Sequence, residues 1–138
     1  MNVVPDTNVW IDWLRAGVAP GELEPGGRLD LFLTTIALQE LWAGAQTEPL
    51  GRTLTALGNL ARTHGRLLNP PAPAWIVSGQ VLAEIAARRR LSAARLRVLR
   101  NDALLAATAL SYDAVVLTAN RKDFDLLSQF LEVRYRAP

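Results

Sequence analysis

The chain has 138 residues, half of them hydrophobic, and this length argues for a single domain over residues 1–138. The absence of cysteine excludes a disulfide framework and a thiolate metal site, and a single histidine, His64, excludes a ribonuclease that works with paired histidines. The formal net charge is only +2. We find no signal peptide and no apolar run of about 18 residues, so we expect a soluble cytoplasmic protein without a membrane span.

Short apolar runs alternate with helical patterns along the chain. Strands are predicted at residues 3–4, 30–35, 66–69, 114–117 and 132–136. Helices are predicted at 7–17, 36–46, with Thr34 or Thr35 as cap, 50–65, 74–90, 92–113 (as one helix or two) and 123–130. A loop rich in proline and glycine is predicted at 20–27. This alternation predicts an α/β fold with a mostly parallel central sheet flanked by helices.

Asp6 follows the first predicted strand, after Pro5, and has two interpretations. It can cap the helix that begins at Thr7, because its side chain can accept free N–H groups of the first turn. It can also be a site acid, because α/β folds bind ligands at the carboxyl ends of their strands. The stretch by itself leaves both open.

Two further acids lie in helical segments. Glu40 has only Ile36, Ala37, Ala43 and Gly44 at three or four residues along its helix, so it lacks a charged face. Asp102 begins the apolar segment "DALLAATAL", where a helix N-terminus would also favour an acid. Each acid is therefore either an ordinary helical residue or part of a site.

The segment "TANRKDF" follows the strand at 114–117. Its Asn120 and Asp123 are oxygen-bearing residues three positions apart, and an Asx-type turn leading to a helix capped by Asp123 would explain them without a site. If both strands lie in one parallel sheet, however, Asp6 and this turn open onto the same edge. Converging carboxylates repel one another, and a divalent cation such as Mg²⁺, which prefers oxygen ligands, would relieve that repulsion.

With these residues, the sequence resembles the PIN-domain ribonucleases, specifically the VapC-type toxins of bacterial toxin–antitoxin pairs. The similarity is carried, in order, by "VVPDTNVWIDWL", "TTIALQELWAG", "RNDALLAATAL" and "VVLTANRKDF", which together span most of the chain. It implies a PIN-like three-layer sandwich, Mg²⁺ or Mn²⁺ as cofactor, and RNA hydrolysis that leaves 5′-phosphate and 3′-hydroxyl ends. It also implies inhibition by a small antitoxin and a homodimer.

The resemblance assigns catalytic roles to Asp6, Glu40, Asp102 and Asp123. Asp6 and Asp102 are expected to ligate the metal, and Glu40 is expected to hold a water of the metal or a second ion. Many members have an aspartate where this chain has Asn120, and others have asparagine there with an acid three residues on, as here with Asp123, so the fourth site residue is either Asn120 or Asp123. Thr7 matches a threonine that orients the first aspartate.

Basic residues gather in the second half of the chain. Six arginines lie between Arg88 and Arg100 with no acid among them. We expect Arg97 and Arg100, which lead towards Asp102, to contact RNA phosphates, together with Arg121 and Lys122. For residues 88–90 we favour a solvated helix face.

The first two predicted helices carry three of the four tryptophans, Trp10, Trp13 and Trp42. They are either core residues or a surface that receives an amphipathic antitoxin helix. Two alternatives to a toxin stay open: a catalytically silent PIN-like module that only binds RNA, and a housekeeping PIN nuclease without an antitoxin.

Overall fold

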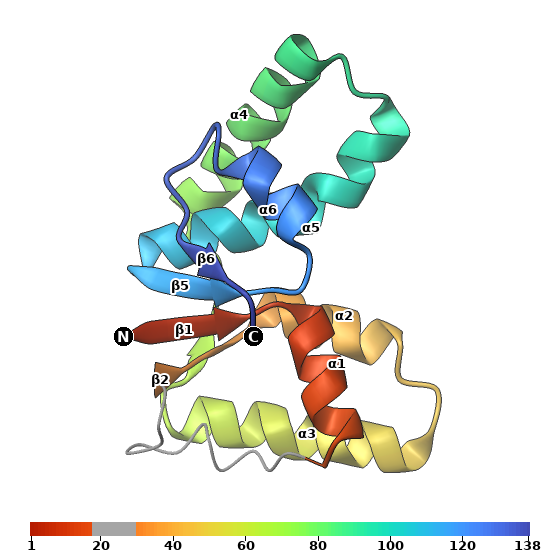
Figure 1. Cartoon of the computed structure of the whole chain (residues 1–138). Helices are drawn as coiled ribbons and strands as arrows, with labels where there is room; N and C mark the ends of the chain where they lie inside the picture. Colours follow the sequence, from red (N-terminus) through yellow and green to blue (C-terminus); the bar gives the residue numbers. More distant parts are fainter. Residues whose placement is uncertain (18–29) are drawn as a thin grey trace.

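The computed structural model describes residues 1–17 and 30–138, and its centre is a parallel sheet with helices on both faces (Figure 1). In spatial order, the four strands of this sheet are β2 (Asp30–Leu31), β1 (Asn2–Pro5), β5 (Ala114–Leu117) and β6 (Tyr135–Arg136). Every neighbouring pair is parallel. A second parallel pair is formed by β3 (Leu33–Thr34) and β4 (Leu67–Leu68). The predicted α/β class with a parallel sheet is confirmed.

Helices occupy most of the chain between these strands. They are α1 (Thr7–Arg15), α2 (Thr35–Ala43), α3 (Glu48–Thr63), α4 (Ala72–Arg89), α5 (Ala93–Ser111) and α6 (Arg121–Leu127). Thr34 caps α2 by accepting a hydrogen bond from the backbone N–H of Ala37 at 3.1 Å, as its position before the apolar run predicts. None of the helices in the described part of the chain is long and apolar enough to cross a bilayer.

Alternation along the strands divides the core between the two faces of the sheet. Val3 and Leu117 pack with side chains of α1, α2 and α3, whereas Val4 and Val116 pack mainly with side chains of α4, α5 and α6. Successive residues of a strand point to opposite faces, so a strand buried on both faces is apolar at every position. This explains why β5, and β1 after Asn2, are continuous apolar runs. The edge where the two strands end is therefore held by packing on both faces of the sheet.

The predicted strand at 30–35 is interrupted in the structure. Its residue Phe32 donates its backbone N–H to Val3 at 2.9 Å, whereas Leu33 donates to Arg66 at 2.8 Å. The chain therefore leaves β1 as its partner and joins β4 within one residue, which gives β2 and β3 in place of one strand. The last predicted strand is likewise shorter, and the proline- and glycine-rich loop predicted at 20–27 lies outside the described residues.

Candidate active site

The carboxyl ends of β1 and β5 meet at one edge of the sheet. Pro5 pairs with Leu117 in parallel register, and the backbone N–H of Asp6 donates to the carbonyl of Leu117 at 2.7 Å. Directly after β5, the hydroxyl of Thr118 donates to Asp6 Oδ2 at 2.9 Å. The predicted meeting of Asp6 with the segment that follows residues 114–117 is therefore confirmed.

Asp6 is both a helix cap and a member of this edge. Its Oδ1 accepts the backbone N–H of Thr7 at 2.7 Å at the start of α1. The hydroxyl of Thr7 donates to Glu40 Oε1 at 2.8 Å, so Glu40 of α2 lies beside the residue that follows Asp6. Thr7 was expected to orient Asp6; it does so through its backbone, while its side chain holds Glu40.

Asp102 reaches the same edge from the middle of a helix, so the prediction that it begins one is wrong. The helix α5 starts at Ala93 and is capped by Ser92, whose hydroxyl accepts the N–H of Arg95 at 3.1 Å. No helix breaker stands between Ser92 and Asp102, which is why the helix runs through. A helix N-terminus therefore does not explain the acid at this position.

Asn120 connects the acids on one side of the site. Its side-chain amide donates to Asp102 Oδ2 at 3.1 Å and to Asp123 Oδ2 at 2.8 Å. Its backbone N–H donates to the hydroxyl of Thr118 at 2.9 Å. Asn120 occupies the N-cap position of α6 and Asp123 lies in the first turn, so the prediction that Asp123 caps this helix is wrong.

Arg95 is a site residue that the sequence did not single out. Its guanidinium donates to Asp123 Oδ1, an ion pair in which the Asp123 side chain is only 7% exposed and that of Arg95 is 31% exposed. Arg95 precedes Asp102 by seven residues, two helical turns, and so lies on the same face of α5. Arg95 and Asp102 share this face because α5 is continuous, which is the one-helix alternative of the prediction for residues 92–113.

The acids of the site perturb one another. The pKa of Asp102 is raised from 3.8 to about 7, first by burial and then by the negative charges of Asp6, Asp123 and Glu40. Burial also raises the pKa of Asp6, although hydrogen bonds from Thr118 and Thr7 oppose this. The four carboxylates are therefore electrostatically coupled.

Asp123 behaves differently from the other site acids. Burial alone would raise the pKa of Asp123, but hydrogen bonds from Arg95 and Asn120, with the charge of Arg95, outweigh it and hold the pKa below its ordinary value. In the described part of the chain, the other three acids, Asp6, Glu40 and Asp102, make no ion pair. The negative charge of the site is thus compensated only at its Asp123 end.

These acids fit a hard divalent cation by their chemistry. All their donors are oxygens, and the pKa of Asp102 is raised first by burial and then by the negative charges of Asp6, Asp123 and Glu40, which a bound cation would offset. Within residues 1–17 and 30–138, no three acidic side chains stand close enough together to form a metal site as they lie. Carboxylate oxygens that accept one hydrogen bond keep a second lone pair, so Asp6 and Asp102 retain the capacity to ligate.

The predicted RNA-contacting residues form two groups, of which the first lies beside Asp123 and the second borders a separate cavity. Arg121 and Lys122 are exposed at the start of α6, next to Asp123. Arg97 and Arg100 instead border a cavity of about 330 Å³ between α4 and α5, together with apolar residues of both helices: Leu82, Ala83, Ala86, Ala93 and Leu96. They lie on a different face of α5 from Asp102, because they are offset from it by about half a helical turn.

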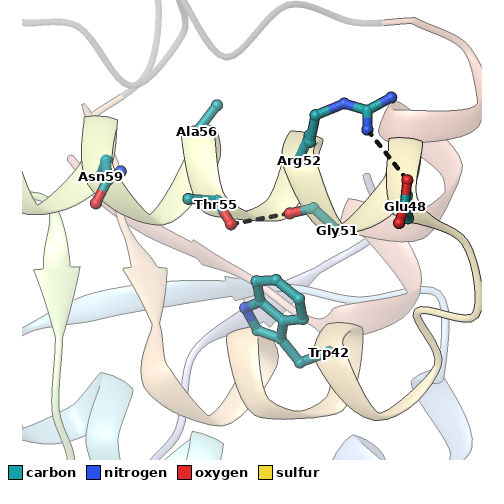
Figure 2. A pocket seen from close by; sticks show the side chains of 7 residues that line it. All are labelled: Trp42, Glu48, Gly51, Arg52, Thr55, Ala56 and Asn59. Carbon is teal, nitrogen blue, oxygen red and sulfur yellow. Dashed lines mark hydrogen bonds and ion pairs between the residues drawn. The ribbon is translucent and has the colours of Figure 1, made fainter.

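The three tryptophans are not one surface. Trp10 is 4% exposed and lies in the core, so the prediction that it contributes to a docking surface is wrong; its ring meets Trp13 edge-on, with centroids 5.5 Å apart. Trp42 is 44% exposed. It borders an open groove of about 700 Å³, which we call the α2–α3 groove, whose other lining residues are Glu48, Gly51, Arg52, Thr55, Ala56 and Asn59 (Figure 2).

Comparison with known proteins places this geometry in a family. The model of the PIN domain matches residues 3–128. Among solved structures, the chain is similar to VapBC-1 from nontypeable Haemophilus influenzae, with 21% identity, a TM-score of 0.69 and coverage of 99% of this chain and 98% of that one. DNA-bound VapBC from Salmonella typhimurium gives 20% identity and a TM-score of 0.69, with the same two coverages.

VapBC-5 from Mycobacterium tuberculosis, described as a member of the VapBC family of toxin–antitoxin systems, gives 21% identity, a TM-score of 0.64 and coverage of 99% and 98%. These likenesses show a shared fold. No curated protein matches the sequence. The match of the domain model covers most of the chain and includes all four site acids, so the chain belongs to the PIN domain family.

Proposed function

We propose that this chain is a metal-dependent endoribonuclease and the toxin of a toxin–antitoxin pair. One observation carries the proposal: three coupled carboxylates, Asp6, Glu40 and Asp102, gather at the carboxyl edge of the sheet and make no ion pair in the described residues. A structural role does not require uncompensated charge at a partly buried edge, because such charge destabilises the fold. A cation-dependent reaction on a polyanion does require it.

In this proposal Asp6 and Asp102 hold Mg²⁺ or Mn²⁺. Thr118 and the backbone of Thr7 fix the Asp6 carboxylate, and Asn120 fixes that of Asp102, so both present oxygens in set directions. A bound divalent cation supplies an acidified water and neutralises charge on the phosphodiester. Glu40, held by the hydroxyl of Thr7, orients the attacking water or a second ion.

RNA is the proposed substrate, and exposed cations beside the site supply its phosphate contacts. Arg121 and Lys122 stand at the start of α6, in the same helical turn as Asp123. Arg97 and Arg100 border the α4–α5 cavity, so a strand that contacts them lies across the hairpin of these two helices. Contacts of this kind position the backbone and do not read its sequence.

The activity is tested with purified protein and single-stranded RNA. Cleavage is expected with Mg²⁺ or Mn²⁺, no cleavage in EDTA, and loss of cleavage in Asp6→Asn, with product ends sequenced for 5′-phosphate and 3′-hydroxyl. Asp12→Asn is the matched control, because Asp12 is an exposed acid on α1. Undiminished cleavage in EDTA would refute the metal mechanism. Binding of RNA without cleavage would identify a silent RNA-binding module.

A small antitoxin is the proposed protein partner, since the similar structures include a member of the VapBC family of toxin–antitoxin systems. The α2–α3 groove suits an amphipathic segment, because it joins the Trp42 ring to polar side chains of α3 (Figure 2). At Gly51 the backbone of α3 passes close to the Trp42 ring, and an added methyl group there would stand at 3.6 Å from the ring, an ordinary van der Waals contact. With Trp10 buried, we place the antitoxin over Trp13 and Trp42.

Co-expression with the product of the neighbouring reading frame tests the partner. The two proteins are expected to co-purify, and Trp42→Asp is expected to weaken the complex. Trp75→Asp is the control, because Trp75 is 59% exposed on α4, away from the groove. Co-purification that Trp42→Asp leaves unchanged would move the partner to another surface, and a nuclease without a partner gene would favour the housekeeping role. The expected homodimer is measured by light scattering.

A further inference from the structure

The ion pair between Arg95 and Asp123 divides the site acids into two kinds. Asp123 and Asp6 both have their two carboxylate oxygens hydrogen-bonded, but one donor to Asp123 is a cation: Oδ1 accepts from the guanidinium of Arg95, and Oδ2 accepts from the amide of Asn120 at 2.8 Å. Within residues 1–17 and 30–138, the hydrogen bonds to Asp6, Glu40 and Asp102 come from neutral donors. Neutral donors orient a carboxylate and leave its charge in place, whereas an arginine pairs with that charge and partly offsets it.

The pair joins two helices and is largely shielded from water. Arg95 is in the first turn of α5 and Asp123 in the first turn of α6, with the Asp123 side chain 7% exposed. An ion pair at a shielded position is screened weakly by salt. Releasing Asp123 from Arg95 would leave an unpaired carboxylate in that setting, which is strongly unfavourable. The resting arrangement therefore keeps this carboxylate on the arginine.

We infer that Arg95 is a positioning residue that withholds Asp123 from the metal, so that Asp123 anchors Asn120 and does not ligate the cation. The chain of contacts runs from Arg95 through Asp123 and Asn120 to Asp102 Oδ2. The hydrogen bond to Asp123 fixes the side-chain amide of Asn120, so that its other N–H points to Asp102. This inference rests on the proposed function, since it assigns the ligands of the proposed metal.

The inference gives Asn120 a specific role in this chain. An aspartate at this position has no amide hydrogens, so it cannot donate to Asp102 and Asp123 at once. With asparagine, the fourth site position supplies donors, and the cation is left to Asp6 and Asp102 with Glu40 nearby. By this inference, neither Asn120 nor Asp123 completes the ligand set of the cation.

The test is a titration of the metal-free protein with Mn²⁺ in the absence of RNA. Binding is measured by calorimetry and by electron paramagnetic resonance. Asp123→Asn is expected to bind Mn²⁺ within about twofold of the wild type. Arg95→Ala is expected to bind it about tenfold more tightly, because a repelling cation is lost and an anionic carboxylate is released. Arg95→Lys, which keeps the charge, is expected to bind like the wild type.

The double variant Arg95→Ala/Asp123→Asn separates the two causes. If the released carboxylate is what attracts the ion, the double variant loses most of the gain of Arg95→Ala. Arg97→Ala controls for removing an arginine from α5, since Arg97 is exposed on another face. The amide resonances of Asn120 are expected to shift in Arg95→Ala and not in Arg97→Ala, which checks the contact in folded protein.

Three results would overturn this inference. A loss of Mn²⁺ affinity of about tenfold in Asp123→Asn would make Asp123 a ligand. Unchanged Mn²⁺ affinity in folded Arg95→Ala would remove the role of Arg95. A wild type that does not bind Mn²⁺ would overturn the proposed function as well, so the two failures are distinguishable.

Discussion

Thr118 links the two halves of the site through a single oxygen atom. Its hydroxyl donates to Asp6 Oδ2 at 2.9 Å, and the same oxygen accepts the backbone N–H of Asn120 at 2.9 Å. Thr118 is completely buried directly after β5. The carboxylate that follows β1 and the turn that carries Asn120 are therefore held in a fixed relation by one side chain that is not itself a candidate ligand.

Replacing Thr118 with valine should destabilise the protein. Valine has nearly the same shape but leaves Asp6 Oδ2 and the N–H of Asn120 without their buried partner, which costs about 1–3 kcal/mol for each unsatisfied group. Urea unfolding in EDTA measures the loss. Thr118→Ser keeps the hydroxyl and should recover most of it. Equal stability of Thr118→Val and wild type would show that these hydrogen bonds contribute nothing net.

Asp102 should make the metal-free protein less stable as the pH rises. Its carboxyl has a pKa of about 7 in the folded chain against 3.8 ordinarily, so between about pH 4 and pH 7 the folded state binds more protons than the unfolded state. Stability from this group is therefore present at low pH and lost as the pH rises through the folded pKa. Asp102→Asn, which cannot ionise, should escape that loss.

The measurement is the melting temperature of Asp102→Asn minus that of the wild type, in EDTA, at pH 5 and pH 8. The difference should be more positive at pH 8, because the wild-type carboxylate is then charged beside Asp6, Asp123 and Glu40. Asp12→Asn is the control, since Asp12 is exposed and should give the same small difference at both pH values. A difference for Asp102→Asn that does not change with pH would contradict the coupling of the acids.

Exchanging Asn120 for aspartate should increase the need for a cation. The change removes the amide hydrogens that now serve Asp102 and Asp123 and adds a negative charge between them. The melting temperature in EDTA at pH 8 should fall, and saturating Mn²⁺ should restore more stability than it adds to the wild type. Asn120→Ala removes the donors without adding charge and should show the smaller Mn²⁺ response. Equal Mn²⁺ responses would mean that the added charge does not face the ion.

The fold was largely predictable because its signals are local. Apolar runs define β1 and β5, and Thr34 stands where a cap is needed. The meeting of Asp6 with the segment after β5 also followed from sequence, because neighbouring parallel strands end at one edge. Residues more than a hundred positions apart, such as Asp6 and Thr118, therefore meet at this edge, and local sequence patterns are enough to predict that they do.

The remaining features depend on relations that a single sequence does not contain. Arg95 faces Asp123 only because α5 is continuous and α6 packs beside it. Trp10 and Trp13 share a helix face, but periodicity does not say which of the two lies deeper in the core. The predicted strand is interrupted at Phe32 because Phe32 donates to Val3 of β1, whereas Leu33 donates to Arg66, which directly precedes β4. Packing between distant segments decides each of these.

Arg97 and Arg100 should contribute to the salt dependence of RNA binding. Both border the α4–α5 cavity, and neither makes an ion pair in the described part of the chain, so their charges are available to phosphates. For a single strand, each lost contact should lower the log–log slope by about 0.7. Arg97→Ala/Arg100→Ala should therefore bind RNA more weakly at low salt, with a slope shallower by about 1.4 if both contacts exist.

Residues 88–90 provide the comparison on the same hairpin. Arg88 pairs with Glu84 at 3.2 Å and Arg89 donates to the neutral amide of Gln129, so two of the three side chains already have partners. Their triple alanine variant should change the slope less, although it removes one more positive charge. Binding is titrated in Ca²⁺ on the assumption that this ion supports binding without cleavage. An unchanged slope in Arg97→Ala/Arg100→Ala would place the RNA elsewhere, and Arg121→Ala/Lys122→Ala, beside Asp123, would then be the variant expected to flatten it.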